Sequence, residues 1–324
     1  MAEGERRPMA AIDYVVPMVF HDDPEWRADY HSAGRVYNEE NLADFVRYRS
    51  WGTERLLVRC IRRFMPFVRT IYIILARESQ KRPWMDEEDV RVVYHREFIP
   101  EKFLPTFNSR TIEMFMKDIP DISELFVYGN DDMFPIAPLD EEDFFVGGVP
   151  CLHHTEKPFP SQPNDFHRAA MNGLNFVAGK FGREYTTSWL KGGHSITPMV
   201  RSTWEMLWKE YGKEMESSIS VFREPKNFNQ WLCPWWHHLS GNYVDRCPRR
   251  KYTGVRKPIE EVLHTILDED IQVVCVNDNE CEKEYMNYGM AVRGALDKRL
   301  EDAGPLIQEE TNRSWLWRVL NSLR

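Results

Sequence analysis

The sequence predicts an α/β protein in which helices pack on the faces of a sheet. Short apolar runs rich in β-branched residues alternate with amphipathic segments over the first 135 residues. This alternation is typical of βα units and of a largely parallel sheet. With 324 residues, of which 42% are hydrophobic and 13% aromatic, the chain is long and apolar enough to bury a full core.

Four apolar runs predict the strands of the first half. The run over residues 12–19 contains Pro17, so we expect a short buried strand that bulges or ends early. The runs over 70–76, 90–94 and 125–129 are rich in β-branched and aromatic residues, and each predicts a buried strand.

Helices are predicted where apolar residues recur at helical spacing. In the first half this pattern covers 50–65, which Pro66 ends, and 108–119, whereas residues 21–41 are polar and predict a loop. Beyond a stretch rich in Gly and Pro, the second half predicts a strand over 271–276. Its predicted helices are 166–181, 200–215, 258–267 and 282–300.

Charge and cysteine usage exclude several classes of protein. The net charge of −9 argues against a protein that acts by binding nucleic-acid phosphates. The six cysteines form no CxxC pair, which argues against a zinc ribbon and favours reduced thiols in the cytoplasm. We expect no transmembrane helix, because no apolar run reaches about 18 residues, and no secretory signal, because residues 1–10 are charged.

An acidic turn follows the strand predicted over 125–129. It consists of Asn130, Asp131 and Asp132. Ligands of α/β sheets bind at the carboxyl ends of strands, and adjacent carboxylates repel each other unless a cation lies between them. Oxygen ligands favour Mg²⁺ or Mn²⁺. The alternative is a solvated turn, because Asn and Asp are common in turns.

A second acidic turn, Asn277 and Asp278, follows the strand predicted over 271–276. Because parallel strands bring their carboxyl ends to one edge of a sheet, we expect the two acidic turns to lie together. Asp13, at the start of the first predicted strand, is a third acidic candidate.

His194 and Arg223 are candidates for contact with an anion. His194 follows Gly192 and Gly193, and we expect a helix to begin just after it, with an N-terminus suited to a phosphate. The planar guanidinium of Arg223 suits paired contacts with phosphate oxygens. A loop histidine and a surface salt bridge are the alternatives. The sequence contains no P-loop, GxSxG or GxGxxG motif.

These segments, in this order, resemble the Stealth family of sugar-phosphate transferases. Within the second family block, the segments 104–109 (LPTFNS) and 130–132 (NDD) match closely. The chain departs from the family pattern after Val16, at Ile196 and after Pro305. The four blocks of the resemblance are Ile12 to Val16, Arg49 to Phe134, His194 to Arg223, and Val274 to Asp278.

The resemblance implies a nucleotide-sugar-binding core of the glycosyltransferase-A type, which is Rossmann-like, with helical additions. We expect one catalytic domain over residues 1–305, with a helical insertion at about 155–270. A basic amphipathic tail over 306–324 completes the chain. Contact of this tail with an anionic membrane is one interpretation, and packing on the domain is the other. The expected location is cytoplasmic, or peripheral to the inner face of the cell membrane.

The resemblance also implies an activity. Such an enzyme transfers a hexose-1-phosphate, typically N-acetylglucosamine-1-phosphate, from a UDP-sugar donor to a hydroxyl of a glycan acceptor. It forms a phosphodiester and releases UMP, here in the synthesis of a bacterial capsule or cell-surface polysaccharide. Two alternatives stay open. One is a metal-dependent glycosyltransferase that forms a glycosidic bond and releases UDP, and the other is a non-catalytic scaffold of polysaccharide assembly.

This activity suggests a role for each candidate residue. His194 is the expected general base, with a hydrogen bond to the phosphate alone as the alternative, and Arg223 is the expected stabiliser of phosphate charge. Asp13 is an alternative base or a nucleotide contact. The expected ligands of Mg²⁺ or Mn²⁺ are Asp131, Asp132 and Asp278. The residues expected to bind substrate or to orient their neighbours are Arg49, Glu54, Asn108, Ser109, Asn130 and Asn277.

Overall fold

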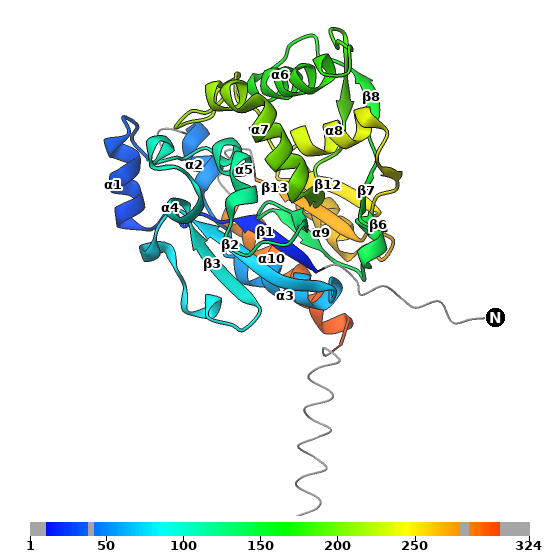
Figure 1. Ribbon diagram of the computed structural model, residues 1–324. Helices are drawn as coiled ribbons and strands as arrows, with labels where there is room; N and C mark the ends of the chain where they lie inside the picture. The colour runs from blue at the N-terminus through cyan, green and yellow to red at the C-terminus, as the bar shows by residue number, and fades with distance from the viewer. Residues whose placement is uncertain (1–10, 38–41, 279–284, 305–324) are drawn as a thin grey trace, which may run out of the picture.

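A five-stranded sheet forms the centre of the computed structural model, which describes residues 11–37, 42–278 and 285–304 (Figure 1). The strand order is β10-β4-β1-β2-β3. Neighbours among β4, β1, β2 and β3 run parallel, and β10 is antiparallel to β4. The sheet confirms the predicted α/β class. Its strands are Ile12–Pro17 (β1), Val68–Leu75 (β2), Val90–Tyr94 (β3), Leu125–Tyr128 (β4) and Thr197–Val200 (β10).

A second sheet of three strands has the order β12-β13-β5. β5 (Met133–Pro135) begins directly after Asp132. β13 (Val273–Asn277) is the strand predicted over 271–276, and it runs parallel to β12 (Arg250–Gly254) and antiparallel to β5. The chain that leaves β4 therefore passes at once into the sheet that contains β13.

Two smaller sheets lie in the segment between β5 and β12 of the chain. One has the order β11-β7-β6, and the other pairs β8 with β9. Their strands are Phe145–Val146 (β6), Val149–Leu152 (β7), Thr155–Pro158 (β8), Ser188–Lys191 (β9) and Val244–Asp245 (β11).

Helices cover the sheets. The longer helices of the described residues are α1 (Pro24–Ser32), α3 (Glu54–Phe64), α6 (Asp165–Gly179), α7 (Arg201–Ser217), α8 (Leu232–Ser240), α9 (Ile259–Leu267) and α10 (Tyr285–Asp302). The shorter ones are α2 (Leu42–Tyr48), α4 (His95–Phe98) and α5 (Ser109–Met114). Within the described residues, 3₁₀ turns span Glu78–Gln80, Pro83–Met85, Glu101–Phe103, Met116–Asp118 and Glu141–Asp143.

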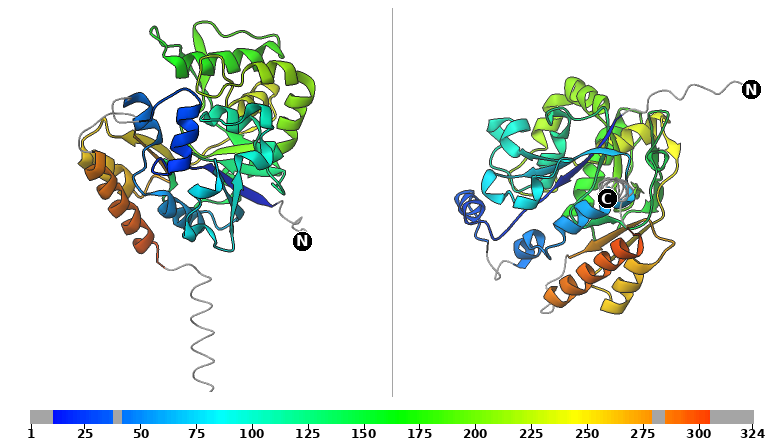
Figure 2. Two further views of the ribbon diagram at one scale, coloured as in Figure 1. Left: turned by 90° about the vertical axis from the view of Figure 1, so that its left-hand side faces the viewer. Right: turned by 90° about the horizontal axis from the view of Figure 1, so that it is seen from below.

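Two groups of helices flank the sheets. α10 packs on α3 and α9, side by side with α9, and α3 also contacts β2 and β5 (Figure 2). α6, α7 and α8 gather at the other end of the molecule, where α8 packs on α6, β7 and β10 (Figure 1). None of the helices in the described part of the chain is long and apolar enough to span a membrane.

One hydrophobic cluster joins the sheets to both groups of helices. β1 is buried over its length except at Pro17. The same cluster contains Trp204 of α7 and Trp235 of α8, whose side chains are fully buried. The single catalytic domain and its helical insertion stay predictions. The tail at 306–324 lies outside the described residues.

The loop predicted over residues 21–41 is wrong in part, because α1 lies within it. The carboxylate of Asp23 accepts a hydrogen bond of 2.6 Å from the backbone N–H of Trp26, and Pro24 occupies the first turn of the helix. Both features stabilise a helix N-terminus. The polar composition of the segment concealed this start.

The helix predicted over 108–119 is shorter than expected. α5 ends at Met114, and a 3₁₀ turn follows from Met116 to Asp118. The apolar spacing that predicted one long helix therefore continues across two different helical segments.

Candidate active site

The first acidic turn leaves the sheet at the carboxyl end of β4. The backbone N–H of Gly129 donates to the carbonyl of Val15 at 3.1 Å, which holds the turn against β1. A Cβ atom at Gly129 would collide with the hydroxyl of Tyr14, so only glycine fits here. Asn130 follows, with its Oδ1 2.8 Å from the hydroxyl of Tyr128. Asn130 therefore fixes the turn at its start.

The two acidic turns meet, as predicted, but for a different reason than the one expected. Asn277 Nδ2 donates to Asp132 Oδ2 at 3.1 Å, and the backbone N–H of Val276 donates to the carbonyl of Asp132 at 2.9 Å. β4 and β13 belong to different sheets, and β5 joins the turns by pairing with β13 immediately after Asp132.

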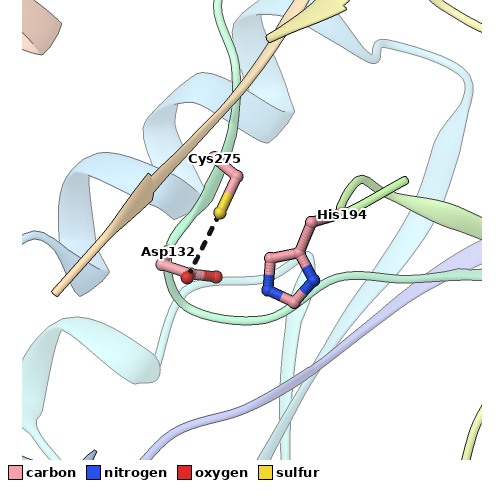
Figure 3. A group of neighbouring side chains, drawn as sticks. All are labelled: Asp132, His194 and Cys275. Atoms are coloured by element: carbon pink, nitrogen blue, oxygen red, sulfur yellow. Dashed lines mark hydrogen bonds between the residues drawn. The ribbon is translucent and has the colours of Figure 1, made fainter. Parts of the chain in front are cut away.

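His194 lies beside Asp132 (Figure 3). A ring nitrogen of His194, a carboxylate oxygen of Asp132 and the sulfur of Cys275 lie within 4.8 Å of one another. The helix expected after His194 is wrong, because the next element is β10, so the predicted phosphate site at a helix N-terminus does not exist here. The sequence misled because the helical spacing that starts near Val200 belongs to α7, after the strand.

Asp131 is partly buried next to other acids. Burial, and then the charges of Asp132 and Glu54, raise its pKa to about 8. Glu54, at the start of α3, is buried, and burial raises its pKa as well, while the hydroxyl of Ser50 donates to its carboxylate. A bound cation would stabilise the ionised form of these acids. The structure thus brings Glu54, Asp131 and Asp132 together.

Asp278 does not join this group of acids. Its Oδ2 accepts a hydrogen bond of 2.6 Å from Nε of Arg49, and its Oδ1 accepts a second bond from Nη2 of the same guanidinium. Both carboxylate oxygens are therefore engaged by one arginine. This geometry gives the predicted role of Asp278 as a direct metal ligand no support.

Arg223 projects from the chain between α7 and α8. Its Nη2 donates to Ser109 Oγ at 2.8 Å, and the residue is exposed. Its positive charge acts on Asp131, which places the guanidinium beside the acidic turn. Arg110 is buried close by, and burial, together with the charge of Arg223, lowers its pKa to about 10. The positive charge of Arg47 also lowers the pKa of both of these arginines. This basic group suits a doubly charged anion.

Asn108 holds the loop that carries Arg223. Its side-chain amide donates to the carbonyls of Ser220 and Phe222, at 3.1 and 3.2 Å, and to Asn227 Oδ1 at 3.0 Å. Its Oδ1 accepts from the backbone N–H of Arg110 and so begins α5. These contacts engage the side-chain amide and position the loop, and the predicted substrate contact of Asn108 stays a prediction.

A cavity of about 230 Å³ lies next to this basic group. Ala76 and His95 of its lining follow directly on β2 and β3, so the cavity opens at the carboxyl ends of parallel strands. Trp26 and Phe107 supply aromatic walls. Phe107 stacks on Phe222, the neighbour of Arg223, with ring centroids 5.5 Å apart. The stacking of Phe107 on Phe222 therefore connects a wall of the cavity to the loop that carries Arg223.

Comparison with known proteins decides the family. The family model described as Stealth protein CR2, conserved region 2, matches residues 47–150. The chain is 30% identical over 274 residues to the receptor polysaccharide phosphotransferase WefC of Streptococcus oralis, covering 74% of this chain and 82% of the relative. This chain belongs to the Stealth family.

Two further relatives of this Stealth protein align over most of their lengths. A capsular polysaccharide phosphotransferase of Actinobacillus suis is 28% identical, with 86% of this chain and 79% of the relative covered. WefC of Streptococcus gordonii is 29% identical, with 90% and 97% covered. The relatives are phosphotransferases by name, and this Stealth protein is accordingly a sugar-phosphate transferase enzyme.

Asp13 of the Stealth enzyme lies away from these residues. It pairs in register with Phe126, near the amino end of β1, whereas the acidic turn follows Tyr128 at the other end of β4. Its carboxylate accepts two hydrogen bonds from Arg69, at 2.9 and 2.7 Å, and one from the backbone N–H of Ser123 at 2.7 Å. These contacts fit a structural role and give the predicted catalytic role no support.

Three residues of the Stealth site escaped the sequence reasoning. Cys275 lies within an apolar strand, where a thiol has the pattern of a core residue. Arg47 and Arg110 carry no motif of their own, and only the fold shows that they lie beside Arg223. The one usable signal was the position of Cys275 two residues before Asn277.

Proposed function

We propose that this Stealth enzyme transfers a hexose-1-phosphate from a UDP-sugar to a hydroxyl of a glycan. N-acetylglucosamine-1-phosphate is the proposed group, UMP the leaving product and a phosphodiester the bond formed. The observation that carries the proposal is the meeting of the acidic turn, His194 and Arg223 at the carboxyl end of β4. The relatives named capsular or receptor polysaccharide phosphotransferases support the synthesis of a cell-surface polysaccharide as its setting.

The donor would lie along the carboxyl ends of the parallel strands. The aromatic walls of the cavity, Trp26 and Phe107, suit a nucleobase, and the arginines that follow suit a diphosphate. Strands are about 4.8 Å apart, so the distance from β4 to the β2–β3 side is about 10 to 14 Å, which suits the length of a nucleoside diphosphate. This arrangement is also the basis for proposing a fold of the glycosyltransferase-A type.

The acids of the first turn fit a divalent cation. Oδ1 of Asp132 is buried and has no hydrogen-bond partner among the described residues, and Asp131 lies next to it with a raised pKa. Asp131 and Asp132 would hold Mg²⁺ or Mn²⁺, which when bound would offset negative charge on the donor phosphates.

The side chains of the enzyme would share the remaining tasks. His194 takes the proton from the acceptor hydroxyl, because a ring nitrogen of imidazole can act as a general base. Arg223 contacts the phosphate oxygens, on which charge develops as the pyrophosphate bond breaks. Asn277 keeps the carboxylate of Asp132 in place through its 3.1 Å hydrogen bond. Asn108 and Ser109 position the guanidinium.

The test identifies the nucleotide that is released. Purified enzyme is incubated with UDP-N-acetylglucosamine, Mg²⁺ and a panel of capsular oligosaccharides, and nucleotides are separated by chromatography. We expect UMP release that needs both the acceptor and the metal, and that EDTA abolishes. Asp132→Asn should abolish it, whereas Asp86→Asn, at an exposed site distant in sequence, should leave it unchanged.

Two other results would replace the proposal. Release of UDP would assign a glycosyltransferase that forms a glycosidic bond. If no nucleotide is released from any donor of a UDP-sugar panel, and calorimetry detects no donor binding, the protein is a scaffold of polysaccharide assembly.

A further inference from the structure

Three side chains with different donor atoms converge beside the acidic turn. Asp132 offers a carboxylate oxygen, His194 a ring nitrogen and Cys275 a sulfur, all within 4.8 Å of one another (Figure 3). Bonds from Zn²⁺ to such atoms are about 2.0 to 2.3 Å long, so two ligands of one tetrahedral ion lie about 3.3 to 3.8 Å apart. Small side-chain movements therefore bring all three within bonding distance of a single ion.

The hydrogen bonds of Asp132 leave one of its oxygens available. Oδ2 accepts from the thiol of Cys275 at 3.3 Å and from Nδ2 of Asn277 at 3.1 Å. Oδ1 is buried without a hydrogen-bond partner in the part of the chain that the structure describes, and so is Oδ1 of Asn277. A buried oxygen without a donor is costly, and a cation bound to it removes that cost.

Different parts of the fold set the positions of the three side chains. Cys275 is buried in β13, and Asp132 is fixed to that strand by the backbone N–H of Val276, so the sheet sets the position of two donors. His194 instead follows Gly193, which has a φ of +86°, a conformation that glycine adopts easily. The third donor thus comes from a separate segment that faces the first two.

We propose that Asp132, His194 and Cys275 form a binding site for a thiophilic divalent transition-metal ion of the Zn²⁺ class. A thiolate, an imidazole and a carboxylate together are ligands that Zn²⁺ and Co²⁺ accept, whereas Mg²⁺ prefers oxygen atoms alone. Binding forms a metal–sulfur bond and releases the thiol proton to solvent. The fourth position of a tetrahedral ion stays open to water or to a ligand.

Such an ion would inhibit the enzyme, and this consequence alone rests on the proposed function. The ring nitrogen of His194 would be bound to the ion and unable to accept the proton of the acceptor hydroxyl. The same ion would occupy the carboxylate of Asp132, which we assign to Mg²⁺. Zn²⁺ would thus suppress UMP release, and a chelator followed by fresh Mg²⁺ would restore it.

A Co²⁺ titration tests the site without any nucleotide sugar. Full-length protein is stripped of metal and titrated with Co²⁺ under anaerobic, reducing conditions. We expect one equivalent to bind, with a sulfur-to-cobalt charge-transfer band in the near ultraviolet. Zn²⁺ should displace it, and Mg²⁺ at about a hundredfold excess should not. Cys275→Ser should abolish the band and weaken binding at least about tenfold.

Two further variants keep the test decisive. Cys247→Ser is the matched control, because Cys247 is a free, partly exposed thiol that lines a cavity with His153 and His154. His194→Gln, on a loop outside the core, should also weaken Co²⁺ binding and covers the case in which Cys275→Ser fails to fold. The proposal is overturned if no charge-transfer band appears, if the band survives both Cys275→Ser and His194→Gln, or if Cys247→Ser removes it. The titration is independent of the outcome of the UMP assay.

Discussion

The side chain of Arg223 is exposed yet held in place by a hydrogen bond. Its removal should therefore affect catalysis far more than stability. Its hydrogen bond to Ser109 Oγ fixes the guanidinium without burying it. We predict that Arg223→Ala lowers kcat for UMP release about 100-fold, because a donor to the developing phosphate charge is lost. The free energy of unfolding should change by no more than about 0.5 kcal/mol. Steady-state kinetics and chemical denaturation measure the two effects.

Arg201→Ala serves as the control for Arg223→Ala. Arg201 is a partly exposed arginine at the start of α7, near the amino end of β4 and away from the acidic turn, and it pairs with Glu205 at 2.9 Å. The variant should keep near-normal turnover. Full activity of Arg223→Ala, or a stability loss as large as its loss of activity, would contradict the assigned role.

At the scale of single residues, the sequence predicted residue types better than their partners. His194 lies beside Asp132 and the charge of Arg223 acts on Asp131, as the motifs suggested. Asp278 and Asn108 also have the right chemistry, but other groups of the protein engage their polar atoms. The partner of Asp278 is 229 positions away in the sequence, so no local pattern could reveal it.

At the scale of elements, the segments with periodically spaced apolar residues were predictable. The helix that depends on an N-terminal cap and the short antiparallel strand were not. The strand predicted over 90–94 matches β3, and the helix predicted over 258–267 matches α9 within one residue. α1 depends on a cap at Asp23 rather than on an apolar stripe, and β10 is a short antiparallel strand next to a helix. Neither α1 nor β10 has a periodic apolar pattern long enough to predict its structure.

The helix that follows β3 begins with a buried histidine, which predicts a pH dependence of stability. Burial lowers the pKa of His95 to about 4, against about 6.5 in the unfolded chain. Below pH 6.5 the unfolded chain binds a proton that the folded chain does not. His95 therefore makes its full contribution to the free energy of unfolding above pH 6.5, and this contribution is lost as the pH falls toward 4. The maximal loss is about 3 kcal/mol.

Denaturation curves of His95→Gln at several pH values test this linkage. The variant should lose stability less steeply than the wild type between pH 6.5 and pH 4. Asp29 and Arg96 line the same cavity and are unchanged in both proteins, so the difference reports His95. His264→Gln, at an exposed position of α9, should keep the wild-type slope. Equal slopes for His95→Gln and the wild type would show that His95 is not the group responsible.

At the scale of the whole molecule, the site exists because two sheets meet. β4 delivers the first acidic turn and β13 the second, and β5 ties them together. The sequence suggested one sheet with a shared edge, since both turns follow apolar strands. Sheet membership depends on strand pairing between distant segments, which apolar runs do not specify. The predicted proximity was confirmed although the predicted topology was not.

The ion pair between Arg49 and Asp278 links the segment before α3 to the end of β13. The side chain of Arg49 is 1% exposed and that of Asp278 is 15% exposed. Removing either partner leaves a buried charge without its counterion, so we predict that Arg49→Ala and Asp278→Ala each destabilise the fold by about 3 kcal/mol. The double variant should lose clearly less than the sum of the two, by at least about 1 kcal/mol. Chemical denaturation of the four proteins gives this coupling.

Arg59 and Asp297 provide the matched pair for this cycle. They are also an arginine and an aspartate far apart in sequence, 2.8 Å from each other, but their side chains are 48% and 47% exposed. Water screens such a pair, so its coupling should stay below about 1 kcal/mol. Additive effects at Arg49 and Asp278 would refute the buried pair as a link between the two parts of the fold. Loss of metal-dependent activity in Asp278→Ala, with stability intact, would instead return Asp278 to the metal site.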